Sequence, residues 1–208
     1  MQDAHEAMLR DLAAYGIRDE RVLAAMRRVP RHEFIPEPYR RGSEYGDHPL
    51  PIGLGQTISQ PFIVAYMTEM LDIQKGEKIL EIGTGSGYQA AVLAEMGARV
   101  FSLEVIPELA EHARSVLTAQ GYDVSVRIGD GYGGWPEEAP FDAIIATCAA
   151  EEVPPDLVRQ LRTGGRLFMP VGAAGVQNLV LLRRGKDGTA LMEDLPVRFV
   201  PMVHRKPG

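Results

Sequence analysis

The most constraining feature of the sequence is a glycine-rich turn that joins a short apolar strand to a helix. Residues 78–82 (KILEI) predict a buried strand, residues 83–87 (GTGSG) the turn, and residues 89–96 a helix that ends at Gly97. A strand, a turn and a helix in this order are typical of a βαβ unit. Because ligands of open α/β sheets bind beyond the carboxyl ends of the strands, the turn marks a candidate ligand site.

The same alternation continues along the rest of the chain. Strands are predicted at 99–105, 124–128, 141–147 and 166–171, with helices that begin at Pro107 and Pro154, the second running to Arg162. Two final strands, 176–184 and 189–201, flank a hairpin turn signal at 186–188. The pattern predicts an α/β fold with a doubly wound, mostly parallel sheet that closes with an antiparallel hairpin.

A helical extension and a long loop precede this core. Gly16 ends a first helix, whose expected apolar face consists of Met8, Leu9, Leu12, Ala13 and Tyr15. A second helix, capped by Asp19 and ending before Pro30, is expected to bury Val22, Leu23 and Met26. Glycine and proline are so frequent in residues 36–61 that no long regular element can form there, and the apolar residues between them favour an ordered loop over a site.

Acidic residues follow the glycine turn at the ends of the next two strands. Glu104 lies about 20 residues after Gly83, where a carboxylate can accept hydrogen bonds from ribose hydroxyls, and Val105 adjoins it. Asp130, followed by Gly131, ends the third strand, where a carboxylate can accept a hydrogen bond from an adenine amino group. Carboxyl ends of parallel strands share one edge of the sheet, so the sequence predicts a site for a nucleoside cofactor.

The cofactor itself is either a dinucleotide or S-adenosylmethionine. The dinucleotide pattern G-x-G-x-x-G that starts at Gly83 requires a third glycine where this chain has Tyr88. Glu81, directly before the turn, suits the positively charged methionine end of S-adenosylmethionine better than a pyrophosphate. We therefore expect S-adenosylmethionine, with S-adenosylhomocysteine as product. The predicted cofactor contacts are Glu81, Gly83, Thr84, Gly85, Ser86, Gly87, Glu104, Val105, Asp130 and Gly131.

Nearly the whole chain resembles the protein-L-isoaspartate (D-aspartate) O-methyltransferases. The most specific stretch is residues 50–61 (LPIGLGQTISQP), which resembles the substrate loop of that family. Further similar stretches are EIGTGSGY at 81–88, PFDAII at 140–145, GGRL at 164–167, PVG at 170–172 and RFVP at 198–201. After the fourth strand the family often has Ala-Ala-Pro, whereas residues 148–152 here are CAAEE. That departure concerns the wall on the substrate side.

The resemblance implies a Rossmann-like class I methyltransferase of one domain, 1–208, with the helical extension and substrate loop in 1–61 and the cofactor-binding core in 62–208. It implies methyl transfer to the α-carboxylate of L-isoaspartyl residues in damaged proteins, which begins repair through a succinimide. Ser59 is the implied catalytic position, and Thr57, Ile58 and Ser59 are the implied substrate contacts. Without the resemblance, the residues favour a turn or cap hydroxyl at Ser59, before a helix that begins at Pro61.

The chemistry agrees with the residues that are available. A carboxyl group with a pKa of about 4 is ionised at pH 7 and needs no base, so alignment of the reacting atoms is the main task. The alternatives are a methyltransferase for another small-molecule or protein acceptor, and a non-catalytic module that binds S-adenosylmethionine. Cys148 lacks the preceding proline of cytosine methyltransferases, so we expect a structural role for it.

Composition limits the partners. Hydrophobic residues make up 45% of the chain, as in ordinary globular proteins, and the formal net charge of −6 disfavours nucleic acid. The five histidines show no metal-ligand spacing, so no metal site is expected. No segment resembles a signal peptide or a membrane span, and a single cysteine fits a reducing compartment. We expect a cytoplasmic monomer that acts on isoaspartyl-containing proteins and peptides, without nucleic acid or membrane partners.

Overall fold

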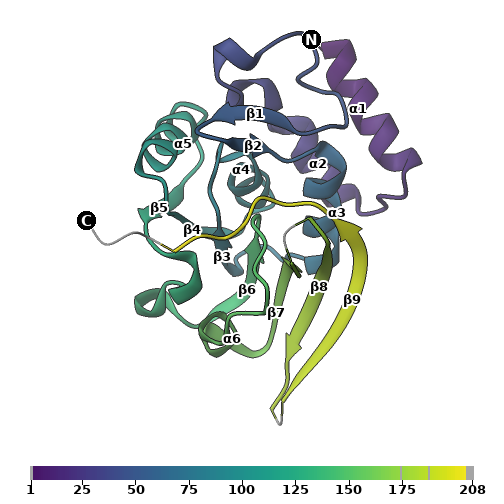
Figure 1. Cartoon of the computed structure of the whole chain (residues 1–208). Coiled ribbons are helices and arrows are strands. Elements are labelled where there is room, and N and C mark those ends of the chain that lie inside the picture. The colour runs from purple at the N-terminus through teal and green to yellow at the C-terminus, as the bar shows by residue number, and fades with distance from the viewer. Residues whose placement is uncertain (1, 174, 187, 205–208) are drawn as a thin grey trace.

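A seven-stranded sheet with the order β5-β4-β3-β6-β7-β8-β9 forms the centre of the protein (Figure 1). The computed structural model describes residues 2–173, 175–186 and 188–204. The strands are β3 (Lys78–Ile82), β4 (Arg99–Glu104), β5 (Val124–Ile128), β6 (Phe141–Ala146), β7 (Leu161–Val171), β8 (Gln177–Arg184) and β9 (Thr189–Val197). The first five are parallel, whereas β8 and β9 add antiparallel to β7 and to each other, as the sequence predicted.

The chain order of the strands produces a switch point between β3 and β6. From β3 the chain moves outward through β4 to β5, and then returns to place β6 on the other side of β3. The connections after these two strands therefore diverge at the carboxyl edge of the sheet and leave a crevice between them. The glycine turn after β3 and residues Thr147 and Cys148 after β6 border this crevice.

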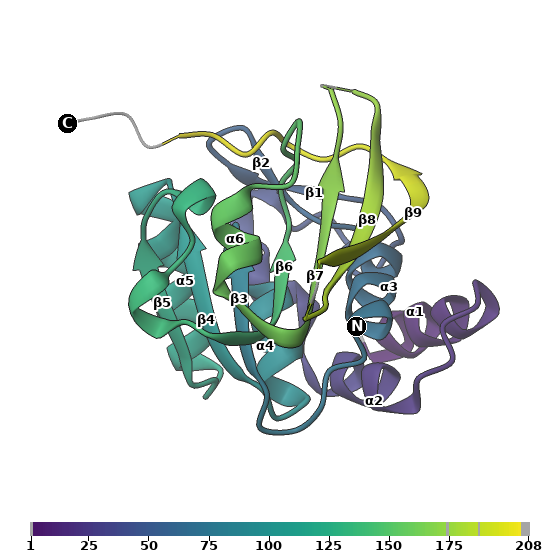
Figure 2. The ribbon, with the colours of Figure 1, turned by 90° about the horizontal axis from the view of Figure 1, so that it is seen from below.

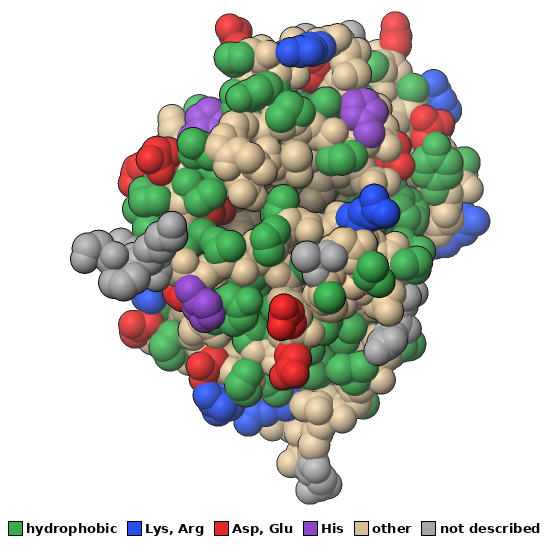
Figure 3. Space-filling view, in the orientation of Figure 1, with side chains coloured by type: hydrophobic (Ala, Val, Ile, Leu, Met, Phe, Trp, Pro, Cys, Tyr) green, Lys and Arg blue, Asp and Glu red, His purple; other side chains and the backbone are tan. Residues whose placement is uncertain are grey.

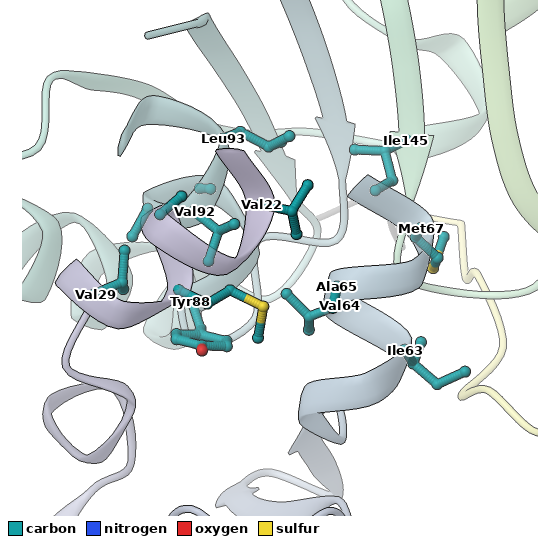
Figure 4. Close-up of a cluster of buried hydrophobic side chains, with 14 of the residues drawn as sticks. Val22, Val29, Ile63, Val64, Ala65, Met67, Tyr88, Val92, Leu93 and Ile145 are labelled. Carbon is teal, nitrogen blue, oxygen red and sulfur yellow. The ribbon is translucent and has the colours of Figure 1, made fainter. Parts of the chain in front are cut away.

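Helices cover both faces of the sheet (Figure 2). They are α1 (Gln2–Ala14), α2 (Glu20–Arg28), α3 (Pro61–Leu71), α4 (Tyr88–Glu95), α5 (Pro107–Ala119) and α6 (Pro155–Gln160). Alternate residues of each strand point to opposite faces, so Ile79 and Ile145 join the core beneath α1 to α5, while Leu80 and Ile144 join the core beneath α6. Figure 4 shows part of the larger core, where α2, α3 and α4 meet β6.

The loop of residues 36–61 is ordered and contains two short strands that were not predicted. Strands β1 (Leu50–Gly53) and β2 (Gln56–Ile58) pair antiparallel. Leu54 and Gly55 connect them with φ angles of 53° and 73°. A two-residue hairpin loop of this kind needs a positive φ at both positions. Leucine rarely adopts a positive φ, so residues 54 and 55 do not form a recognisable turn signal. The 3-10 helices η1 (Arg31–Phe34) and η2 (Glu37–Tyr39) precede the hairpin.

Several predicted boundaries were wrong. Tyr15 lies beyond the end of α1 and is exposed. Strand β7 begins at Leu161 rather than Arg166, because Leu161 already pairs with Phe141 of β6. The register then shifts before Arg166 pairs with Ala143, and Gly164 and Gly165 lie in this irregular part of the strand. The expected helix 154–162 accordingly spans only Pro155–Gln160. The hairpin turn predicted at 186–188 includes residue 187, which lies outside the described residues.

The last strand also ends earlier than predicted. Strand β9 ends at Val197 instead of Pro201, and residues 198–204 cross the carboxyl ends of the parallel strands (Figure 1). We call residues 198–204 the strap. The Ala149 N-H donates to the carbonyl of Val200 at 2.9 Å, and the Met202 N-H donates to the carbonyl of Ala149 at 2.7 Å. Among the described residues, no helix has the length and apolar character that crossing a bilayer requires.

Candidate active site

The glycine turn approaches the end of β6 closely. Gly83, Gly85 and Gly87 have φ angles of 92°, 53° and 87°, which glycine adopts without strain. A Cβ atom on Gly83 would lie 2.6 Å from the Thr147 hydroxyl, so no larger residue fits without a shift. The Gly83 N-H donates to the carbonyl of Leu103 at 2.8 Å and fixes the turn beside β4. The turn thereby forms an open cradle for a ligand.

Glu104 holds the turn from the end of β4. Its Oε2 accepts a hydrogen bond from the Gly85 N-H at 2.8 Å, and its Oε1 accepts one from the Ile106 N-H at 3.0 Å. The residue is largely buried and lines a cavity together with Val105. Each carboxylate oxygen can accept more than one hydrogen bond, so both oxygens keep capacity for ribose hydroxyls.

Glu81 is fully buried beneath the turn. Its Oε2 accepts a short hydrogen bond from the Ser102 hydroxyl, which lies 2.6 Å from that of Thr84. Its Oε1 has no hydrogen-bond partner among the described residues. Burial raises the pKa of Glu81 to about 8, the Ser102 hydrogen bond opposes this rise, and the negative charge of Glu104 adds to it. The site thus contains a carboxyl group that a cation would bind and ionise.

Asp130 differs from its predicted surroundings. Its Oδ1 accepts a hydrogen bond from the Tyr132 N-H at 2.9 Å and caps the 3-10 helix η3 (Gly131–Gly133), and its Oδ2 lies 3.0 Å from Nδ1 of His204. The neighbouring Gly129 and Gly131 line the cavity next to Glu104. Protein groups therefore occupy much of the Asp130 carboxylate, and the adenine contact assigned to it stays a prediction.

The cavity beside Glu104 has a volume of about 70 Å³. Its walls come from the hairpin, the ends of β3, β4, β5 and β6, helix α5 and the strap, through Gln56, Thr57, Ile82, Gly83, Gly85, Leu103, Glu104, Val105, Ile106, Leu109, Gly129, Gly131, Thr147, Cys148, Val200, Pro201, Met202 and Val203. The sequence did not predict the contribution of the strap, because residues 198–201 were assigned to the last strand. Burial raises the pKa of the Cys148 thiol far above its usual range, which opposes a nucleophilic role.

A larger cleft of about 810 Å³ adjoins this cavity. Thr57, Ser59 and Thr147 line it, together with residues of α3, of the β8–β9 pair and of the strap. Figure 3 shows the face that carries it, which is hollowed near its centre. Thr57 and Thr147 line both cavities, and Ser59 faces both the cleft and a small space beside Glu81. These residues therefore mark the point where the two sites meet.

Ile58, unlike its neighbours, turns away from the cleft. Its side chain is 3% exposed and belongs to the core, although it also borders the small space beside Glu81. Alternation along β2 explains the difference, because Thr57 and Ile58 must point to opposite sides of the hairpin. The substrate contact assigned to Ile58 stays a prediction, and among the spaces described only the small one beside Glu81 reaches its side chain.

Asp47 holds the residues that follow Ser59 in place, a role that was not predicted. Its Oδ1 accepts a hydrogen bond from the Phe62 N-H at 2.8 Å, and its Oδ2 accepts one from the Gln60 side chain at 3.3 Å. Gln60, the N-cap residue of α3, supplies no capping bond of its own. Asp47 therefore caps α3 from a distance and fixes the loop in which Ser59 lies.

Comparison with known proteins identifies the family. The family model described as Protein-L-isoaspartate(D-aspartate) O-methyltransferase (PCMT) matches residues 2–207. The chain belongs to this family. The protein-L-isoaspartate O-methyltransferase of Gloeobacter violaceus is 56% identical to it, over 92% of this chain and 94% of the relative. That of Opitutus terrae is 55% identical, over 94% of this chain and 84% of the relative.

Solved structures of the same family share the fold. A protein-L-isoaspartate O-methyltransferase superposes with a TM-score of 0.86 at 30% identity, over 95% of this chain and 65% of the other. A putative protein-L-isoaspartate O-methyltransferase from Plasmodium falciparum, in complex with S-adenosyl-L-homocysteine, gives a TM-score of 0.84 at 27% identity, over 96% and 98%. The resemblance and the fold class expected from the sequence are both confirmed.

Proposed function

We propose that this protein transfers a methyl group from S-adenosylmethionine to the α-carboxylate of L-isoaspartyl residues in proteins and peptides, with Ser59 at the acceptor. One observation carries the assignment of the site. Ser59 and Thr57, from the stretch most specific to the family, line the large cleft where it meets the cavity beside Glu104. The family membership of the chain supports the reaction itself.

The residues around the glycine turn suit S-adenosylmethionine. Its cationic methionine end would find the unpartnered Oε1 of Glu81, and its ribose would find the Glu104 carboxylate, which the Gly85 N-H already orients. Gly83 leaves the space that a Cβ atom would fill against Thr147. The contacts proposed at Thr84, Ser86, Gly87 and Val105 complete this cradle. When bound, S-adenosylmethionine supplies an electrophilic methyl group on a sulfonium.

The residues of the cleft orient the acceptor and do not activate it. An isoaspartyl α-carboxylate is already ionised at pH 7, so no base has to remove a proton. The Ser59 hydroxyl donates a hydrogen bond to one carboxylate oxygen and leaves the other to face the methyl group. Positioning of this kind can lower a barrier by roughly 7 to 11 kcal/mol in favourable cases. Asp47, through the start of α3, keeps Ser59 in place.

The ester product makes the isoaspartyl carbonyl a target for the following backbone nitrogen. That attack expels methanol and forms a succinimide, which hydrolyses in part to normal aspartate. The outcome is repair of a damaged protein. A net charge of −6 disfavours nucleic acid as a partner, and one cysteine fits a reducing compartment. We therefore include in the proposal that the protein acts as a cytoplasmic monomer on protein substrates, without membrane partners.

Paired peptides test the proposal. Initial rates of labelled methyl transfer are measured on one peptide that contains isoaspartate and on its aspartyl isomer, with wild-type protein and with Ser59→Ala. We expect transfer to the isoaspartyl peptide alone. We also expect a lower kcat for Ser59→Ala with nearly unchanged affinity for S-adenosylhomocysteine. Cofactor binding without transfer to any isoaspartyl peptide would instead identify a non-catalytic binding module.

A further inference from the structure

One positive charge lines the acceptor cleft. Among the described side chains that line the cleft, Arg198 is the only charged one, although the protein as a whole has a net charge of −6. Arg198 is exposed, and it makes no hydrogen bond or ion pair with any side chain that the structure describes. An acidic protein thus presents an accessible cation in the cleft that we assign to its substrate.

The backbone on both sides of Arg198 is fixed. Val197, the last residue of β9, pairs with Gln177, and the Phe199 N-H donates to the Gln177 side chain at 2.7 Å. The next residue, Val200, accepts the hydrogen bond from Ala149. The guanidinium therefore extends from an anchored position in the strap, so anion binding restricts the side chain of Arg198 but does not have to order its backbone.

The reacting carboxylate is a poor partner for this guanidinium. Methylation removes the negative charge of the acceptor, so an ion pair with Arg198 would weaken as the reaction proceeds. An interaction that is stronger in the ground state than in the transition state raises the barrier. Ser59, a neutral hydroxyl in the same cleft, avoids this cost. Arg198 is thus suited to an anion that does not react.

We propose that Arg198 is a specificity-determining residue that binds an acidic side chain close to the isoaspartyl residue of the substrate. This inference rests on the proposed function, and it adds a preference for isoaspartyl sites in acidic sequence. The contact is made equally before and during methyl transfer, so the preference resides in KM rather than kcat. Exposed ion pairs of this type change an equilibrium by about two- to fivefold at low salt.

Matched peptides and variants test the proposal. Each isoaspartyl peptide carries Glu or Gln at one of the two positions on either side of the isoaspartyl residue, and kcat/KM is measured at low and high ionic strength. The proteins are wild type, Arg198→Gln, Arg198→Glu, Arg198→Lys and the control Arg99→Gln. Arg99 is exposed and begins β4, so it lies at the opposite edge of the sheet from the cleft and its replacement changes the net charge equally.

The expected result is a Glu-to-Gln ratio of kcat/KM of about two to five at one or more positions in wild type, Arg198→Lys and Arg99→Gln. Arg198→Gln should bring the ratio to one, Arg198→Glu should bring it below one, and salt should reduce it in wild type. Methylation of all peptides with a ratio of one in wild type would overturn this inference alone. The inference would also be overturned if Arg198→Gln kept the wild-type Glu-to-Gln ratio, or if it lowered kcat/KM by the same factor on every peptide. If wild type methylates none of the peptides, the proposed function fails and the inference falls with it.

Discussion

Replacement of Glu81 by glutamine should remove a pH dependence from cofactor binding. Glutamine has nearly the same shape, and its amide oxygen can still accept the hydrogen bond from Ser102, but it cannot become an anion. In wild type the buried carboxyl group has a pKa of about 8 because burial disfavours its charged form. It is therefore neutral below pH 8 until a cation arrives. Binding of the cationic methionine end should ionise it and release a proton.

The magnitude follows from the fraction of molecules that carry the carboxylate. With a pKa of about 8 for Glu81, roughly one-tenth are ionised at pH 7 and half at pH 8. If the ionised form is the one that binds, the apparent affinity is reduced by that fraction. The Glu81 contribution to the dissociation constant of wild type for S-adenosylhomocysteine should thus fall about fivefold between pH 7 and pH 8 and level off above pH 8.

Calorimetric titration with S-adenosylhomocysteine from pH 6.5 to 9 measures this slope in wild type and in Glu81→Gln. The amino group of the ligand titrates near pH 8 as well, but it does so identically with both proteins. The difference between the two curves therefore isolates Glu81. 5′-Methylthioadenosine lacks the amino-acid end and should bind both proteins with no such difference. Parallel curves for wild type and Glu81→Gln with S-adenosylhomocysteine would show that Glu81 does not ionise on binding.

Two further substitutions examine the other contacts of the site. Glu104→Ala should weaken S-adenosylhomocysteine binding by about 1 to 3 kcal/mol, the scale for hydrogen bonds to a charged group, and unchanged affinity in calorimetry would remove Glu104 from the site. Asp47→Ala should lower thermal stability by about 0.5 to 2 kcal/mol through the lost cap of Phe62 and should lower kcat/KM on isoaspartyl peptide with cofactor affinity intact. Asp47→Asn keeps an acceptor oxygen and should restore most of the stability and most of the kcat/KM. Equal activity of Asp47→Ala and wild type would show that the cap does not position Ser59.

Local signals explain why much of the fold could be predicted. The strand Lys78–Ile82 was predicted with its exact ends because an apolar run meets a glycine turn, and α5 begins at Pro107 because proline favours the first turn of a helix. Asp19 caps α2 as expected, since the capping bond joins residues two positions apart. These features depend on neighbours in the sequence.

Distant partners explain what could not be predicted. The Asp47 carboxylate caps a helix that begins 14 residues later, which no capping pattern describes. The strap and a strand have the same extended backbone, so residues 198–201 fit either, and only their partner Ala149 distinguishes the two. Arg198 belongs to the RFVP stretch that resembles the family, but no local pattern assigned it to the cleft. Its place in the cleft depends on the packing of the strap against the end of β6.

We propose the isoaspartyl α-carboxylate as the methyl acceptor. Mass spectrometry of an isoaspartyl peptide after incubation with the protein and S-adenosylmethionine tests it most directly. We predict a gain of one methyl group, followed in mild base by loss of methanol to give the succinimide, with the aspartyl isomer unmodified. Equal methylation of both isomers, or a product that is stable in mild base, would contradict the account and indicate another acceptor.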